Sequence, residues 1–359
     1  MAIENEIKEL EEEITSTPYN KATQKHIGML KAKLAKLKEL QQSGAGSKKG
    51  KAGVVFSVKK QGDATVLLVG MPSVGKSTLI NAITNAESKT AAYDFTTLDV
   101  IPGMLEHNGA RIQVLDIPGI IEGASRGKGA GKKVLSAARQ ADMVLLMVDV
   151  TKDIAWQLGL IRKELYEAGF RIDQRLPEIR LMKKTTGGLA VSFTRKSRLD
   201  AKTVESVLKE FRILNADVII REDITADQLV DFLMANRVYV PSLVVVNKMD
   251  AVSARLEPGW IAISAKDKKN LGMLKEAIWS KLGLARIYLK KIGQEPDLKE
   301  PLIMRIGCTV LDVASRLHKE MAKEFAFARV WGRSASFAGQ KKGIDHKLLD
   351  RDIVELHKR

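Results

Sequence analysis

Short apolar runs alternate with amphipathic stretches through the middle of the chain. Buried strands are indicated at residues 64–70 (ATVLLVG), 111–117 (RIQVLDI), 141–150 (ADMVLLMVDV), 241–250 (PSLVVVNKMD) and 260–266 (WIAISAK). Helical patterns stand between or after them, at residues 77–86, 132–141 and 270–282. Strands that alternate with helices predict an α/β fold, with a mostly parallel sheet covered by helices on both faces.

This alternation is interrupted between residues 171 and 238. The interruption contains an apolar stretch at 185–194, helical patterns at 199–213 and 225–237, and a strand-like segment at 215–223. It is too long for a connection, because loops in compact domains rarely exceed about 15 residues. We therefore expect a small inserted α+β domain.

The pattern changes again near the C-terminus. Residues 301–307 favour a strand, residues 309–325 a helix, and residues 327–332 and 352–359 two further strands. A strand and a helix followed by returning strands predict a small β-grasp-like module.

Residues 1–42 favour two helices, the second starting at the capping pair Thr17-Pro18. Apolar residues recur in this second helix at helical spacing, with lysines between them. It is either part of a hairpin that packs on the protein or a basic arm that contacts RNA or a partner, and we slightly favour the arm. Residues 43–53 (SGAGSKKGKAG) resemble a linker or a basic loop.

The charge balance changes the expected class of partner. The 359 residues include 59 Lys and Arg against 43 Asp and Glu, a formal net charge of +16. Such a charge suits a polyanion such as RNA, although it also fits a basic soluble protein without such a partner. The N-terminus is acidic and has no apolar core, and no apolar run reaches the ~18 residues of a membrane span, so we expect neither a signal peptide nor a membrane protein.

The single cysteine, Cys308, excludes a disulfide within the chain and suits a reducing cytoplasm. It stands among apolar residues of a predicted strand. We therefore expect a buried structural thiol rather than a catalytic one.

A phosphate-binding pattern stands between the first strand and the first helix. Residues 70–78, GMPSVGKST, fit G-x-x-x-x-G-K-[ST], and the strand–helix context is the one that this motif requires. Backbone N–H groups and the helix start would bind phosphates, while Lys76 would reach the β- and γ-phosphates and Ser77 would bind Mg²⁺. The expected nucleotide-contacting residues here are Pro72, Ser73, Val74, Gly75, Lys76, Ser77 and Thr78.

A guanine-binding pattern follows a later strand. Asn247, Lys248 and Asp250 form N-K-x-D at the carboxyl end of that strand, the edge where open α/β sheets bind ligands. One carboxylate accepts both the N1–H and the 2-amino group of guanine, whereas adenine offers no such pair, which disfavours an ATPase. Lys248 would lie along the purine and Asn247 would tie loops together. A second base-contacting segment is expected at Ser264, Ala265 and Lys266.

Two candidate switch segments lie between these patterns. Asp116, with Pro118 and Gly119, fits D-x-x-G, so its carboxylate would hold Mg²⁺ through water and the Gly119 N–H would bind the γ-phosphate. Upstream, Thr97 is expected to coordinate Mg²⁺ when the γ-phosphate is present, with Thr96 as a second possibility. We therefore expect Lys76, Thr97 and Gly119 to serve hydrolysis, and Ser77, Thr97 and Asp116 to hold the metal.

No glutamine follows Gly119. In well-known GTPases a glutamine orients the attacking water, but Ile120 and Ile121 offer no side-chain hydrogen bond. Slow unaided hydrolysis is the expectation.

The motifs FTTL…PG, DIPGIIEGASRGKGAG and NADVIIRED together resemble the DRG proteins, developmentally regulated GTP-binding proteins of the Obg GTPase superfamily. The resemblance covers essentially the whole chain. It implies an N-terminal helical region and basic linker (residues 1–60), a GTPase domain (61–170 and 239–288) interrupted by an inserted α+β domain (171–238), and a C-terminal TGS domain of β-grasp fold (289–359).

The resemblance also implies a GTP-hydrolysing switch in translation that works with ribosomes or RNA, and in some relatives with a regulatory protein. We expect a cytoplasmic monomer that binds neither membranes nor DNA. Some relatives recruit K⁺ through a phosphate-loop asparagine. Ser73 stands at that position with a shorter side chain, which puts this route to K⁺ in doubt, although K⁺ stays a possible cofactor beside Mg²⁺.

An alternative function stays open, namely an RNA-binding module that GTP holds in shape while hydrolysis is incidental. The inserted domain carries cations that could contact phosphates or could simply be solvated: Lys183, Lys184, Arg195, Lys196 and Arg198.

Overall fold

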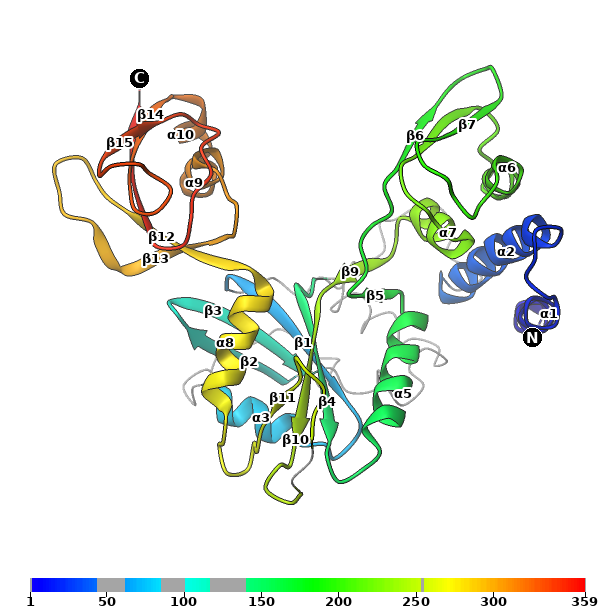
Figure 1. The fold of residues 1–359 in the computed structure, drawn as a ribbon, viewed down its shortest axis with the longest axis horizontal. Helices are drawn as coiled ribbons and strands as arrows, with labels where there is room; N and C mark the ends of the chain where they lie inside the picture. The colour runs from blue at the N-terminus through cyan, green and yellow to red at the C-terminus, as the bar shows by residue number, and fades with distance from the viewer. Residues whose placement is uncertain (1, 44–61, 85–100, 117–139, 253–254, 359) are drawn as a thin grey trace. The chain divides into compact units, whose positions relative to one another are not determined.

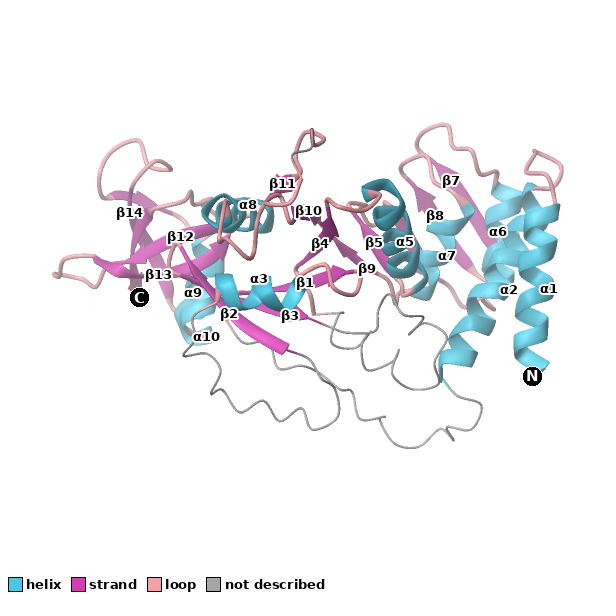
Figure 2. Cartoon of the chain, turned by 90° about the horizontal axis from the view of Figure 1, so that it is seen from below, coloured by secondary structure: helices cyan, strands magenta, loops and turns pink. Residues whose placement is uncertain are grey.

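A computed structural model describes residues 2–43, 62–84, 101–116, 140–252 and 255–358, and the chain divides into two compact units (Figure 1). One unit combines Met1–Val55 with Gly169–Tyr239, and the other combines Phe56–Ala168 with Val240–Arg359. Both units mix helices and strands (Figure 2). Among the helices that the structure describes, none is both long and apolar enough to cross a membrane.

The larger unit contains a six-stranded sheet in the order β11-β10-β4-β1-β3-β2. Five strands are parallel, namely β1 (Ala64–Gly70), β3 (Ala110–Asp116), β4 (Met143–Asp149), β10 (Ser242–Asn247) and β11 (Ile261–Ala262). The edge strand β2 (Ile101–His107) runs antiparallel to β3. Every residue of β1 and β4 is buried, as expected for strands of a parallel sheet covered on both faces. The predicted α/β fold is confirmed.

Three described helices cover this sheet. Helices α3 (Lys76–Ile83) and α8 (Leu271–Leu282) lie on one face, and α5 (Ile154–Glu167) lies on the other (Figure 1). Leu79, Ile80, Leu274 and Ile278 of α3 and α8 join the core of the sheet. The side chain of Asp153 caps α5 by accepting a hydrogen bond from the Trp156 N–H.

The turn between β2 and β3 contacts later segments of the same unit, among them α8 and β13 (Asp297–Arg305). Asn108 and Gly109 form it with φ angles of 52° and 79°. The His107 ring and the Asn108 amide both contact Glu276 of α8, at 2.8 and 3.3 Å. A Cβ atom on Gly109 would stand 2.6 Å from the Pro301 ring, so only glycine fits this approach.

A second sheet, of five strands, occupies the C-terminal part of this unit in the order β13-β12-β16-β14-β15. Its elements are β12 (Leu284–Leu289), β13 (Asp297–Arg305), α9 (Val310–Leu317), α10 (Lys319–Lys323), β14 (Phe325–Trp331), β15 (Gln340–Lys342) and β16 (Asp352–Lys358). Its core includes Val313, Val330 and Val354, with Cys308 among them. The predicted β-grasp module is confirmed. The single helix predicted at 309–325 is wrong, because extended backbone at His318 separates α9 from α10.

The smaller unit is built around a three-stranded sheet in the order β6-β8-β7. Its elements are α1 (Ala2–Ser16), α2 (Gln24–Ser43), β6 (Ile179–Lys183), β7 (Leu189–Phe193), α6 (Ala201–Glu210), β8 (Ala216–Ile220) and α7 (Ala226–Met234). Short strands β5 (Phe170–Ile172) and β9 (Val238–Val240) pair with each other. The predicted start of the second helix at Thr17-Pro18 is wrong. The Asn20 side chain instead holds a turn, and α2 begins at Gln24.

Helix α2 packs on the inserted segment and is not a free basic arm. Ala32 is fully buried in a core shared with α6, β8 and α7. Lys31, Lys33 and Lys38 pair with Asp227, Glu6 and Glu11 at 2.6, 2.9 and 2.6 Å. The structure therefore supports the alternative of a helical hairpin that packs on the protein, and contact of this hairpin with RNA or a partner stays a prediction.

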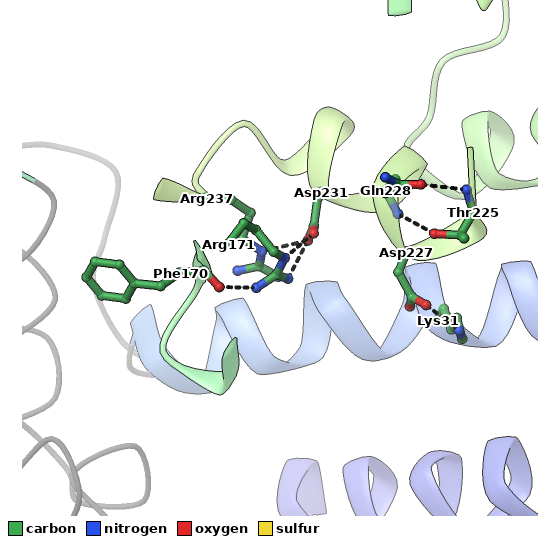
Figure 3. A network of polar contacts seen from close by, with 8 residues as sticks. All are labelled: Lys31, Phe170, Arg171, Thr225, Asp227, Gln228, Asp231 and Arg237. Carbon is green, nitrogen blue, oxygen red and sulfur yellow. Dashed lines mark hydrogen bonds and ion pairs between the residues drawn. The ribbon is translucent and has the colours of Figure 1, made fainter. Parts of the chain in front are cut away.

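A buried ionic cluster joins β5 to α7 within this unit. Asp231 accepts hydrogen bonds from Arg171 and Arg237, and Arg171 also donates to the Phe170 carbonyl (Figure 3). At the start of α7, Thr225 and Gln228 form a reciprocal capping box, which satisfies N–H groups that the helix leaves unpaired.

Candidate functional site

The loop between β1 and α3 has the backbone of an anion-binding loop. Ser73 and Gly75 adopt positive φ angles of 63° and 100°, and Gly75 stands at the N-cap of α3. No side chain caps this helix start. The N–H groups of the first turn therefore keep their capacity to bind an anion. Pro72, Ser73, Ser77 and Thr78 are exposed, whereas Val74 is buried and takes part through its backbone.

The Lys76 ammonium lies inside the same loop. Its Nζ donates to the carbonyl oxygens of Gly70 and Met71, at 3.0 and 3.2 Å. These neutral acceptors hold the cation at the loop without neutralising it. An anionic ligand at the helix start would therefore meet a positive side chain already in place.

Asn247, at the end of β10, connects two loops. Its Nδ2 donates to the Val74 carbonyl at 2.9 Å, and its Oδ1 accepts from the Ala265 N–H at 2.9 Å. The residue is 3% exposed, so both hydrogen bonds are protected from water. One amide therefore fixes the loop after β1 against the loop after β11.

The Asp250 carboxylate lies exposed beside this bridge. The pKa of Asp250 lies below its ordinary value, mainly because the Ser264 hydroxyl donates a hydrogen bond to the carboxylate and, to a smaller extent, because of a backbone hydrogen bond. Asp250 is therefore an anion at neutral pH. Ser264 is itself buried and accepts a hydrogen bond from the Asp267 N–H at 3.1 Å, and Lys266 is exposed.

Lys248 has a partner that sequence reasoning missed. Its Nζ contacts Asp149 Oδ2 at 2.6 Å, and the Asp149 side chain is 4% exposed. Burial works to raise the pKa of Asp149, but hydrogen bonds from Lys248 and Thr151 outweigh it and lower that pKa. The only sequence signal was an acidic residue at the end of an otherwise apolar strand.

Asp116 ends β3 at the same edge of the sheet. It is 5% exposed, and its Oδ1 is buried without a hydrogen-bond partner in the described part of the chain. Burial raises the pKa of Asp116, and the positive charge of Lys76 partly opposes this effect. A buried carboxylate oxygen without a donor fits a site for a hydrated cation.

These groups divide the carboxyl edge of the sheet into two ends. One end offers N–H groups, the Lys76 ammonium and the Asp116 carboxylate, which suits phosphates with a divalent cation. The other offers the Asp250 carboxylate, which suits a pair of adjacent N–H donors. Asn247 lies between the two ends and joins them.

Three consecutive parts of the chain match known protein families. Residues 65–184 match the family described as 50S ribosome-binding GTPase, residues 186–284 match the C-terminal region of that domain, and residues 285–358 match the TGS domain. An uncharacterized GTP-binding protein of Methanocaldococcus jannaschii is 53% identical over 369 residues, covering 99% of this chain and 93% of its own. The chain belongs to the Obg GTPase superfamily. It is a GTP-binding protein with a TGS domain.

Other relatives of this GTPase come from distant organisms. GTP-binding protein 1 of Schizosaccharomyces pombe is 46% identical over 364 residues, covering 99% of each chain. Human developmentally-regulated GTP-binding protein 2 is 43% identical over 368 residues, covering 100% of each chain. The similarity therefore extends along essentially the whole length of this chain and of each relative.

Three expected parts of the GTPase site lie outside the described residues. They are Thr97 with the alternative Thr96, Gly119, and the segment that begins with Ile120 and Ile121. The roles predicted for them stay predictions. The structure brings together the others: the loop residues 72–78, Asp116, Asn247, Lys248, Asp250 and residues 264–266.

Proposed function

We propose that this chain is a Mg²⁺-dependent GTPase of the DRG branch that acts in the cytoplasm as a switch with the ribosome or its RNA. The observation that carries the proposal is the Asn247 bridge, because it joins the Lys76 loop to the loop beside Asp250. GTP is the ligand whose two ends suit those two loops.

In this proposal Asp250 reads the base by accepting from the N1–H and the 2-amino group of guanine. The Ser264 and Ala265 N–H groups donate to Lys269 and Asn247. The N–H of Lys266 is therefore the group that we assign to the guanine O6. Lys248 lies along the purine.

The phosphates would occupy the loop of residues 72–78, with Lys76 on the β- and γ-phosphates. Ser77, Thr97 and, through water, Asp116 would hold Mg²⁺, which when bound neutralises charge on the phosphate oxygens. The Asp116 Oδ1, which is buried without a hydrogen-bond partner among the described residues, supports this assignment. Gly119 and Thr97 would respond to the γ-phosphate, so that its loss releases both segments.

Hydrolysis by this chain would be slow without help. Intrinsic Ras turnover is on the order of 10⁻⁴ s⁻¹ even with its glutamine, and Ile120 offers no substitute for that side chain. We propose that the ribosome, a regulatory protein or K⁺ supplies or orders the missing water-positioning group.

The test is GTP turnover by the purified chain, alone and with ribosomes, in KCl and in NaCl. We expect slow unaided turnover that rises with ribosomes, and no turnover in Lys76→Ala. A fast unaided rate that neither ribosomes nor K⁺ changes would contradict partner dependence. Failure of the wild-type chain to bind GTP would overturn the whole proposal.

A second candidate function is an RNA-binding module in which hydrolysis is incidental, and the net charge of +16 favours it. Thr97→Ala separates the two. If a Thr97→Ala chain binds GTP, fails to hydrolyse it and still functions fully in cells, the module is correct. Loss of function in that variant supports the switch.

A further inference from the structure

The Asp149–Lys248 pair lies next to the proposed base site, and the sheet fixes its position. Parallel strands β4 and β10 place Asn247 opposite Asp149, and the Val150 N–H continues the ladder by donating to the Asn247 carbonyl at 3.1 Å. Lys248, the next residue, has a φ of 66°, in the left-handed region that a lysine seldom adopts. The chain therefore turns sharply at Lys248, directly after the last paired residue of β10.

Asp149 is itself held from several directions. Its Oδ1 accepts from the Thr151 N–H at 2.9 Å and from the Thr151 hydroxyl at 2.7 Å, which leaves Oδ2 for Lys248. The fully buried Gln157 brackets the Asp149 backbone, accepting from its N–H at 3.0 Å and donating to its carbonyl at 2.9 Å. Both carboxylate oxygens of Asp149 accept hydrogen bonds, and the backbone N–H and carbonyl of the residue are also hydrogen-bonded. The position of the carboxylate is therefore fixed.

The consequence falls on the lysine, whose side chain is 38% exposed. A free lysine samples many rotamers, and ordering it costs up to about 2 kcal/mol. Because the Lys248 Nζ is held at 2.6 Å from Asp149, the lysine side chain is already ordered before a ligand binds, and binding does not carry this entropic cost. The pair also cancels the ammonium charge locally, so Lys248 offers its methylene chain, whereas Lys76 keeps its charge for phosphate.

We infer that Asp149 is a positioning residue for nucleotide binding: it acts through Lys248, holding the lysine chain ready as a platform for the base. The inference rests on the proposed GTP site. It assigns a role to a side chain that lies outside the phosphate-binding and guanine-binding motifs. Because the platform carries no base-specific hydrogen bond, Asp149 strengthens binding without changing the preference for guanine, which stays with Asp250.

The test is a double-mutant cycle on the full chain, with a fluorescent GDP analogue as the probe. Asp149→Asn keeps the size of the side chain and removes the charge, and Lys248→Met keeps the linear chain and removes the ammonium. We expect Asp149→Asn to weaken GDP binding about tenfold, which corresponds to about 1.4 kcal/mol. In the Lys248→Met background the same change should weaken binding less than about twofold. An equal loss in both backgrounds would show a merely structural role and overturn the inference.

Two further measurements complete the test. GDP and ADP should compete with the probe in the same ratio for wild type and Asp149→Asn, and a changed ratio would contradict a base-independent role. Thr151→Val removes one hydrogen bond to the Asp149 carboxylate and replaces Asp149→Asn in the cycle if that variant does not fold. Thr151→Val should weaken GDP binding in the wild-type background and have little effect on it in the Lys248→Met background. A wild-type chain that does not bind GDP refutes the proposed function, whereas wild-type binding with additive variants refutes only this inference.

Discussion

Gly75 adopts a φ of 100°, and a Cβ atom built on it would stand 2.6 Å from the Asn247 Nδ2. Gly75→Ala should therefore lower the free energy of unfolding by about 2 kcal/mol, since left-handed backbone alone costs an alanine about 1–2 kcal/mol. The same change should weaken GTP binding, because Asn247 must move. Chemical denaturation and nucleotide titration measure the two effects.

Gly272, in α8, provides the matched control. A Cβ atom there would meet nothing within 4 Å in the part of the chain that the structure describes. Gly272→Ala should stabilise the helix by about 0.5–1 kcal/mol and leave nucleotide affinity unchanged. If the two alanine variants behave alike, the close approach of Asn247 is not the cause.

Asp116 illustrates a residue whose burial disfavours its own charge. Its pKa is raised by burial, so the folded chain binds this proton more tightly than the unfolded chain does. That contribution to stability is present below the ordinary Asp pKa and is lost as the pH rises through the raised folded value. At pH 7 nucleotide-free Asp116→Asn should be more stable than wild type, by about 1 kcal/mol, and should not hydrolyse GTP.

The stability difference should shrink as the pH falls toward about 4, where the wild-type carboxyl binds its proton. Thermal unfolding at several pH values measures it. An Asp116→Asn chain that is less stable than wild type at pH 7 would contradict a buried Asp116 charge without a partner among the described residues.

Cys308 is 7% exposed, and burial raises the pKa of its thiol to about 11. The thiol should therefore stay protonated and resist iodoacetamide at pH 8, since the thiolate is the reactive form. Mass spectrometry should find the thiol modified only after the chain is unfolded in denaturant. Rapid modification of the native chain would contradict its structural role.

At the scale of elements, the ionic cluster between β5 and α7 fixes the base of the inserted segment. Arg171→Met would leave the buried Asp231 with Arg237 as its remaining described cation, so the loss of stability should stay below the cost of a fully uncompensated buried charge, about 3–5 kcal/mol. Hydrogen exchange of the α7 amides should accelerate accordingly. Tryptophan fluorescence cannot serve here, because residues 156, 260, 279 and 331 all belong to the larger unit.

The control is Arg198→Met in the same unit. Arg198 pairs with Asp223 at 2.8 Å, but its side chain is 75% exposed, and such pairs contribute at most about 1 kcal/mol. Similar exchange rates in the two variants would show that burial of the cluster does not matter.

The sequence predicted best those elements whose pattern is local. The apolar runs of β1, β4 and β10 need no tertiary information, because a strand buried on both faces is apolar throughout. Strand β2 was missed because Pro102 and Gly103 interrupt its pattern. An edge strand tolerates a proline, and a Cβ atom on Gly103 would stand 2.5 Å from the Thr84 methyl group, a contact that only the fold reveals.

At the candidate site, too, local motifs were predictable from the sequence, whereas contacts between distant segments were not. Contiguous motifs predicted Lys76, Asn247 and Asp250, because the spacing of those residues carries their chemistry. Asp149 lies 99 residues before Lys248, and only the pairing of β4 with β10 brings them together. The pairing of the α2 lysines could not be foreseen either, because it depends on which helix face meets α1 and α7.

At the scale of the whole molecule, some of the exposed Lys and Arg side chains form ion pairs, whereas others form none within the described residues. In the inserted segment, Lys184 and Arg198 pair with Asp217 and Asp223. Lys183, Arg195 and Lys196 are exposed, and they form no ion pair within the described residues. These three are therefore the better candidates for contact with RNA phosphates.

Binding of a ribosomal RNA fragment should weaken steeply as KCl rises. Arg195→Gln and Lys196→Gln should each reduce the slope of log affinity against log salt by about 1. Lys33→Gln and Lys38→Gln, which remove paired lysines of α2, should leave that slope unchanged. Fluorescence anisotropy across a KCl series measures all four, and equal slopes in every variant would contradict phosphate contact by the inserted segment.

The Asn247 bridge also determines which ligands the site selects by length. A free base or a free pyrophosphate engages one of the two loops that the bridge connects, whereas a nucleotide of the right span engages both. The second contact then forms at a high effective concentration, since the first has already brought it near. Because the amide fixes the separation of the loops, a nucleotide bound as proposed would have to match the distance between them, and a ligand with correct ends but a different reach would engage one loop only.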